Sequence, residues 1–136
     1  MARLSGIGSG CLKEEDLQVL KRIVLELART HEFPQGSAEC GYEIVAPLDG
    51  AGHLDLEGWK SQKDKCVVRR FWKNEDDQRG RLVHHKGHQW AIAYDDARLD
   101  EEPIFRFDQH VFKEGEYVSI TEQDETPLPF KIVSVK

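Results

Sequence analysis

The sequence predicts an α+β fold in which one long N-terminal amphipathic helix packs on a curled, mainly antiparallel sheet or a partly open β-barrel of about six to seven short strands. Two observations lead to this prediction: helical periodicity near the N-terminus, and short β-type segments at hairpin spacing afterwards. The sequence also lacks the strand-helix-strand alternation that would indicate a parallel sheet. Because many short strands would leave exposed edges in a flat sheet, a curled sheet covered by the helix is the most economical closure.

The length of 136 residues suits one domain with its own core. Residues 1–11 are rich in glycine and serine, which predicts a flexible leader. The remaining residues, 12–136, are predicted to form a single α+β domain.

The helix is predicted from Leu12 to Thr30. At about 100° per residue, its apolar side chains fall on one half of the helical wheel and its charged side chains on the other. The acidic run Glu14 to Asp16 in the first turn interacts favourably with the helix dipole. Leu25 is the exception, because it projects from the polar face, where it could mark a contact with a second chain.

Later segments alternate in the manner of strands or carry β-branched and aromatic residues. Asp55 is placed to cap a helix of about two turns, although Gly58 weakens that prediction. The predicted strands are Tyr42 to Ala46, Cys66 to Trp72, the two arms of a hairpin within Arg81 to Tyr94, Ile104 to Asp108, Tyr117 to Thr121 and Phe130 to Val135.

The formal net charge of −6 disfavours nucleic acid and anionic membranes as partners. The basic and aromatic stretch Lys60 to Lys73 is the exception, but strand alternation makes Arg69 and Arg70 point apart. No apolar run approaches the roughly 20 residues needed to span a bilayer. The three cysteines, Cys11, Cys40 and Cys66, lack CxxC spacing, which predicts free thiols and a cytoplasmic location.

Three of the six histidines lie in the hairpin, as His84, His85 and His88. If Lys86 and Gly87 form a two-residue turn, His85 and His88 are directly opposed and could share a divalent transition metal. Lysine is a poor residue for such a turn, so a longer turn with a different register stays open. A third ligand would have to come from elsewhere, such as His53, His110 or Asp108.

No phosphate-binding glycine loop, nucleophile elbow or HExxH motif occurs in the sequence. Cys40 is interpreted as a small buried hydrophobe and not as a nucleophile, and the acidic segment Asp95 to Glu102 as a solvated loop. Solvated turn histidines without a cofactor are favoured over a metal site.

We therefore predict a non-enzymatic module that binds a protein or a small molecule through the concave side of the sheet or near His85, His88 and Trp90. The alternative is a metal-binding protein or metal-dependent enzyme that uses His85 and His88. A third hypothesis is self-association through the helix at Leu25. The predicted state is a monomer or a weak homodimer.

Overall fold

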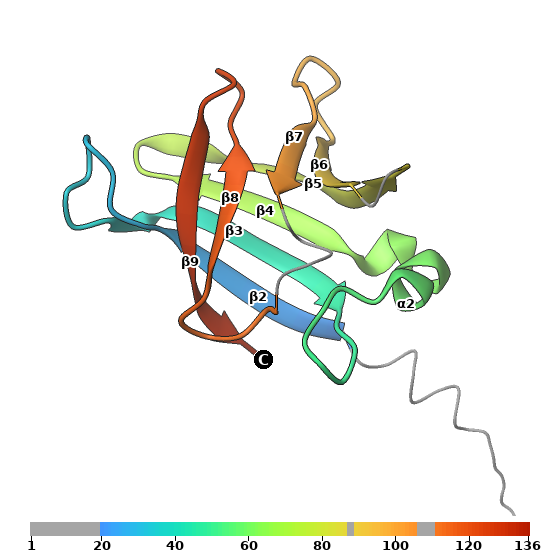
Figure 1. Cartoon of the computed structure of the whole chain (residues 1–136). Helices are drawn as coiled ribbons and strands as arrows, with labels where there is room; N and C mark the ends of the chain where they lie inside the picture. The colour runs from blue at the N-terminus through green and yellow to red at the C-terminus, as the bar shows by residue number, and fades with distance from the viewer. Residues whose placement is uncertain (1–19, 87–88, 106–110) are drawn as a thin grey trace, which may run out of the picture.

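The computed structural model describes residues 20–86, 89–105 and 111–136. In these residues eight strands form a closed barrel in which every neighbouring pair is antiparallel and β9 pairs back onto β2 (Figure 1). The predicted leader, residues 1–11, lies outside the described residues. The strands are β2 (Leu20–Leu27), β3 (Ser37–Pro47), β4 (Val67–Trp72), β5 (Glu75–His85), β6 (Gln89–Tyr94), β7 (Glu102–Phe105), β8 (Tyr117–Thr121) and β9 (Pro127–Val135).

The predicted α+β fold with a long N-terminal helix is wrong. In the described part of the predicted helix, β2 is a strand that pairs with β3 on one side and β9 on the other. Its buried residues Ile23, Leu25 and Leu27 alternate with more exposed ones, which is the period of a strand. The apolar residues of this short segment fit both periods, and strand pairing on both sides decides between them.

Leu25 shows the difference most directly. It was the residue that did not fit the predicted helix, and it is fully buried inside the barrel. The proposed contact between two chains through an exposed Leu25 is therefore wrong. Whether the protein is a monomer or a weak homodimer stays a prediction.

The helical segments of the described chain are the short helix α2 (Leu56–Ser61) and a 3-10 turn at Lys63–Lys65. The predicted N-cap is confirmed, because Asp55 Oδ1 accepts a hydrogen bond from the Gly58 backbone N–H at 3.2 Å. Gly58 is tolerated in this helix because α2 packs closely on the end of β3: a Cβ at this position would lie 3.0 Å from Pro47 Cβ.

The β5-β6 hairpin exists, but its turn is longer than two residues. His85 is opposite Gln89 in the ladder, and His84 is opposite Trp90. The directly opposed pair of His85 and His88 that a two-residue turn would create is therefore not formed, and the longer turn applies. His88 itself lies outside the described residues.

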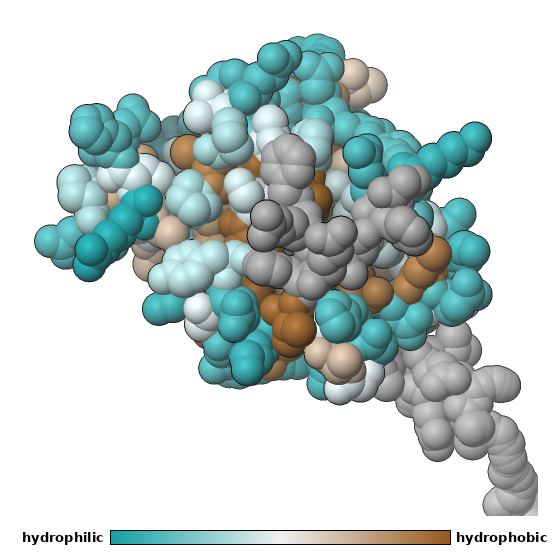
Figure 2. Space-filling model, viewed as in Figure 1, coloured by the Kyte–Doolittle hydropathy of each residue, from teal (hydrophilic) through white to brown (hydrophobic). Residues whose placement is uncertain are grey.

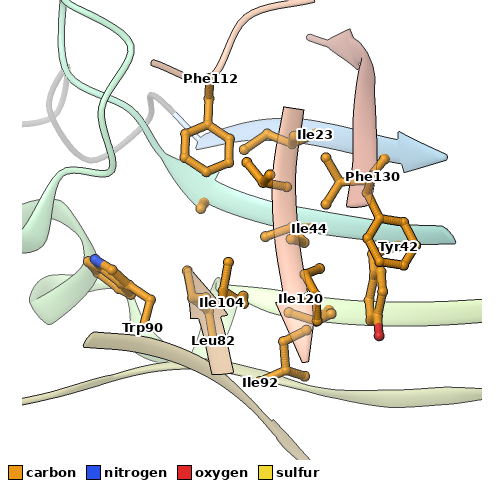
Figure 3. Packing of buried hydrophobic residues seen from close by; sticks show 14 of the residues in the cluster. Ile23, Tyr42, Ile44, Leu82, Trp90, Ile92, Ile104, Phe112, Ile120 and Phe130 are labelled. Atoms are coloured by element: carbon orange, nitrogen blue, oxygen red, sulfur yellow. The ribbon is translucent and has the colours of Figure 1, made fainter. Parts of the chain in front are cut away.

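Inward-pointing side chains fill the barrel with one apolar cluster (Figure 3). Figure 3 shows Trp90 and Phe112 at one side of this cluster and Tyr42 with Phe130 at the other, with Ile44 and Ile120 between them. Cys40 and Cys66 are free thiols, as predicted, and both are buried, which was predicted for Cys40. Cys11 lies outside the described residues.

One end of the barrel is covered, and we call it the closed end. It carries α2, the 48–54 loop and Phe112. Trp59 of α2 donates from Nε1 to the Leu82 carbonyl oxygen at 2.9 Å, and its ring packs edge-on against Trp90 with centroids 5.5 Å apart. The Phe112 backbone N–H donates to the Gly52 carbonyl oxygen at 2.7 Å, which fixes the loop over the core.

The outer surface is mainly hydrophilic in the view of Figure 2, with more hydrophobic residues toward its centre. Among the described residues, no helix has the length and apolar character needed to cross a membrane.

Candidate functional site

A cavity of about 450 Å³ opens at the opposite end of the barrel, which we call the open end. Its lining comes from the ends of β4 and β6, the starts of β5, β7 and β9, and the 122–126 loop. All of these segments lie at the end away from α2. Neighbouring strands are antiparallel, so every second connection between strands lies at the same end of the barrel. The cavity is therefore the mouth of the barrel.

The floor of the cavity holds a buried ion pair. Arg70 of β4 donates from Nη2 to Glu122 Oε1 at 2.6 Å, and the two side chains are 13% and 9% exposed. The second Arg70 nitrogen, Nη1, donates to Glu75 Oε1 at 3.3 Å. Strand alternation places Arg70 inside and Arg69 outside, where Arg69 contacts Glu43.

Tyr42 links Glu122 to a second buried carboxylate. Its hydroxyl lies 2.8 Å from Glu102 Oε1 and also contacts Glu122 Oε2. Tyr94 donates to the same Glu102 oxygen at 2.5 Å, and Gln123 Nε2 donates to Glu102 Oε2 at 3.0 Å. Glu102 is 1% exposed and is held on both oxygens. We call Tyr42, Arg70, Tyr94, Glu102 and Glu122 the floor network.

Burial sets the electrostatics of the floor network. Loss of solvation raises the pKa of Glu122, although hydrogen bonds from Tyr42 and the charge of Arg70 act in the opposite direction. Burial also raises the pKa of Tyr42 and of Tyr94, and the neighbouring carboxylates add to that effect. Both tyrosines are therefore neutral hydroxyl donors at any physiological pH.

The walls above the floor network carry both apolar and polar side chains. Trp72 lines one side, and the Arg70 guanidinium carbon lies 4.2 Å from its ring centroid. Leu99 and Leu128 line other parts of the wall. The polar residues of the lining outside the floor network are Glu32, Glu75, Gln78, Gln123, Asp124 and Thr126. Apolar surface combined with convergent polar groups is typical of sites for small molecules.

Those residues singled out from the sequence for function that the structure describes do not line this cavity. Trp90 is 2% exposed and packs in the core at the closed end, with its ring 4.6 Å from that of His84. His85 points outward and contacts Glu101, with 2.7 Å between Nε2 and Oε1. His53 Nδ1 lies 3.9 Å from Asp49 Oδ1 in the 48–54 loop. His88, His110 and Asp108 lie outside the described residues.

No group of three or more potential metal ligands is found in the part of the chain that the structure describes. A metal site formed by His85 and His88 stays a prediction, because its other named ligands lie partly in residues that are not described.

Sequence reasoning missed the floor network because its members are far apart in the chain. Glu102 was interpreted as part of a solvated loop, yet it is the first residue of β7 and points inward, as Ile104 does. The one available signal was alternation: Val68, Arg70 and Trp72 share a face, as do Ile120 and Glu122.

Comparison of the chain with protein-family models, with curated proteins and with solved structures gives no significant match.

Proposed function

We propose that this protein is a binding module whose barrel holds a small molecule in the cavity at its open end. The observation that carries the proposal is the floor network, a set of buried charged and hydroxyl groups directly beneath an open cavity. A volume of about 450 Å³ falls within the range of about 300–1,000 Å³ that is usual for small-molecule sites.

The energetics of burial support this interpretation. A buried ion pair is often no more stabilising than well-packed apolar side chains of similar volume, since both charges lose their hydration. The closed end of the same barrel is filled with apolar side chains, so this fold is able to pack without ions. Buried, convergent polar groups in a cavity are therefore better explained by ligand binding than by stability.

The buried free thiols Cys40 and Cys66 fit a reducing compartment, and we accordingly propose a cytoplasmic location.

The proposal is tested by blocking the cavity. Gln78 lines the cavity from β5, and Arg79, the next residue, is exposed on the outer face of the same strand. We expect Gln78→Trp to fill part of the cavity and Arg79→Trp to leave it open. A library of small molecules that represents cations, anions and neutral compounds is screened by thermal shift and confirmed by isothermal titration calorimetry.

Compounds that bind in the cavity should stabilise wild type and Arg79→Trp alike and lose at least about tenfold in affinity for Gln78→Trp. Binding that is equal in both variants would place the ligand elsewhere and would refute the proposal. A library without any compound that binds wild type would count against it in the same way.

A further inference from the structure

The geometry of the floor network leaves it one proton short. The Tyr42 hydroxyl carries a single proton and contacts a carboxylate oxygen of both Glu102 and Glu122. The Tyr94 proton is already donated to Glu102. If both carboxyl groups were ionised, one of the two contacts of Tyr42 would bring two oxygen lone pairs together without a proton between them. One additional proton shared by Tyr42 and Glu122 removes this conflict, because Glu122 then donates to Tyr42 and Tyr42 donates to Glu102.

Apart from this shared proton, the side chains that line the cavity carry a large excess of negative charge. Among the described lining residues, the one cation is Arg70, while the carboxylates are Glu32, Glu75, Glu102, Glu122 and Asp124. A cleft lined mainly by one sign of charge concentrates ligands of the opposite sign. With its shared proton the floor network is neutral, and without that proton it carries one negative charge.

We propose that the cavity binds a small organic cation, an ammonium group on an apolar or aromatic body, and that the ammonium binds at the Glu122 carboxylate in place of the proton that Glu122 shares with Tyr42. The inference rests on the proposed function, since it names the ligand of the same cavity. The ammonium group keeps its own protons and its covalent bonds, and the displaced proton passes to solvent. The network thus exchanges one positive charge for another.

Arg70 is a poor receptor for an anion, although it is the cation of the cavity. Both of its Nη atoms are engaged, with Glu75 and with Glu122. Its Nε has no hydrogen-bond partner among the described residues, but this atom exposes less than 1 Å² and so does not face the open volume. An anion would also have to enter against the carboxylates of the lining.

The apolar part of the ligand has a matching surface. Trp72, Leu99 and Leu128 line the cavity above the floor network. An aromatic or aliphatic body packs on these side chains, while the ammonium group reaches the carboxylates beneath.

The groups that face Glu122 from the surrounding strands are consistent with this exchange. β3 contributes Tyr42, β4 contributes Arg70, β6 contributes Tyr94 and β7 contributes Glu102. β9 contributes Phe130, whose ring packs edge-on against that of Tyr42 with centroids 5.1 Å apart. Glu75, Glu32 and Asp124 lie at the rim and add negative charge. Burial raises the pKa of Glu122, so its protonated form persists to higher pH than for an exposed carboxyl group.

The test uses three probes of similar size: 2-phenylethylamine as the cation, 2-phenylethanol as the neutral compound and 3-phenylpropionate as the anion. Affinities for the intact protein are measured by isothermal titration calorimetry. Each titration is repeated in two buffers with different ionisation enthalpies, which gives the number of protons released. We expect the amine to bind roughly tenfold or more tightly than the other two, since a hydrogen bond between an ammonium group and a carboxylate is stronger than one to a neutral hydroxyl.

We also expect binding of the amine to release up to about one proton and to strengthen as the pH rises. Glu122→Gln removes the carboxyl group that releases the proton and carries the negative charge. Proton release should therefore disappear, and affinity for the amine should fall about tenfold. The matched control is Glu101→Gln, since Glu101 precedes Glu102 but is exposed and contacts His85 outside the barrel. This control should behave as wild type.

If the alcohol or the carboxylate binds wild type as tightly as the amine or more tightly, and Gln78→Trp abolishes that binding, the cation inference is overturned. The proposed function would still stand in that case. Amine binding without proton release would overturn the exchange. Failure of all three probes, while another compound binds in the cavity, would also overturn the inference alone. If Glu122→Gln does not fold, the proton count on the wild-type protein decides the question.

Discussion

The two ends of the barrel are built by the same strands but present different chemistry inward. Along β4, Val68 lies toward the closed end and Arg70 toward the open end. Ile120 of β8 is likewise followed by Glu122, which lies just beyond the end of that strand. The closed end is sealed by Trp59 of α2. The open end keeps a cavity over buried charges. The comparison indicates that the closed end supplies most of the stability, while the open end gives up some stability to hold a site.

Loss of an aromatic ring at the closed end should have the largest effect. Trp90 is almost fully buried between Trp59 and His84, so Trp90→Ala should lower the free energy of unfolding by about 3–5 kcal/mol through the cavity it leaves. Urea denaturation measures the change. Trp90 Nε1 has no hydrogen-bond partner in the described residues, so Trp90→Phe is a suitable control and should cost less than about 1.5 kcal/mol. An alanine variant as stable as the phenylalanine variant would contradict this role of the closed end.

Loss of the buried cation at the open end should have a somewhat smaller effect. Arg70→Ala leaves Glu122 buried without its ion-pair partner, and should cost about 3 kcal/mol in the same denaturation experiment. In the double variant Arg70→Met and Glu122→Gln, no uncompensated charge of the pair remains. We expect this variant to recover at least about 1 kcal/mol relative to Arg70→Ala. A double variant less stable than Arg70→Ala would show that the ion pair itself stabilises the barrel.

The smallest of the three expected effects on the free energy of unfolding is its change with pH, which should differ between the two ends. A raised pKa in the folded state means that the folded protein holds the proton more tightly than the unfolded chain, so stability falls as pH rises through the folded pKa. For Glu122 this loss begins above the ordinary value of 4.5. For the buried Cys66 thiol at the closed end, burial raises the pKa from 9.0 to about 11, so its loss begins only in alkaline solution.

Measurement of the free energy of unfolding across this pH range should therefore show two separate declines. Glu122→Gln should remove the acidic decline alone. Cys66→Ala should remove the start of the alkaline decline, from about pH 9 to 10, whereas the part above pH 10 should remain because the pKa values of the buried Tyr42 and Tyr94 are raised above 10.0. If Glu122→Gln leaves the acidic decline unchanged, the open end does not titrate as we describe.

The elements that sequence alone predicted well are those with strong local signals. Tyr117 to Thr121 was predicted with the bounds that β8 has, and the cap of α2 at Asp55 follows from a side-chain preference that operates within three residues. Strand β2 could not be assigned in this way. Its apolar residues satisfy two periods, and the pairing of β2 with β9 that decides between them involves residues about a hundred positions away.

The candidate site was beyond sequence reasoning for the same reason. The hairpin histidines attracted attention because they are adjacent in the chain, whereas the contacts of Tyr42 with Glu102 and Glu122 join residues 60 and 80 positions apart. Alternation indicated which face Arg70 occupies, but barrel closure determines what lies opposite. Composition alone gives no sign that Glu102 is buried.

The pairing of β9 with β2 also governs how the chain must fold. β2 is the first strand of the described residues and β9 the last, so the barrel cannot close until the 127–135 segment is available. Until then, one edge of β2 offers unpaired backbone groups next to Ile23 and Leu25. Pairings of such long sequence separation fold slowly. A nascent or truncated chain that lacks β9 should therefore be prone to aggregation, and addition of a peptide with the β9 sequence should suppress it.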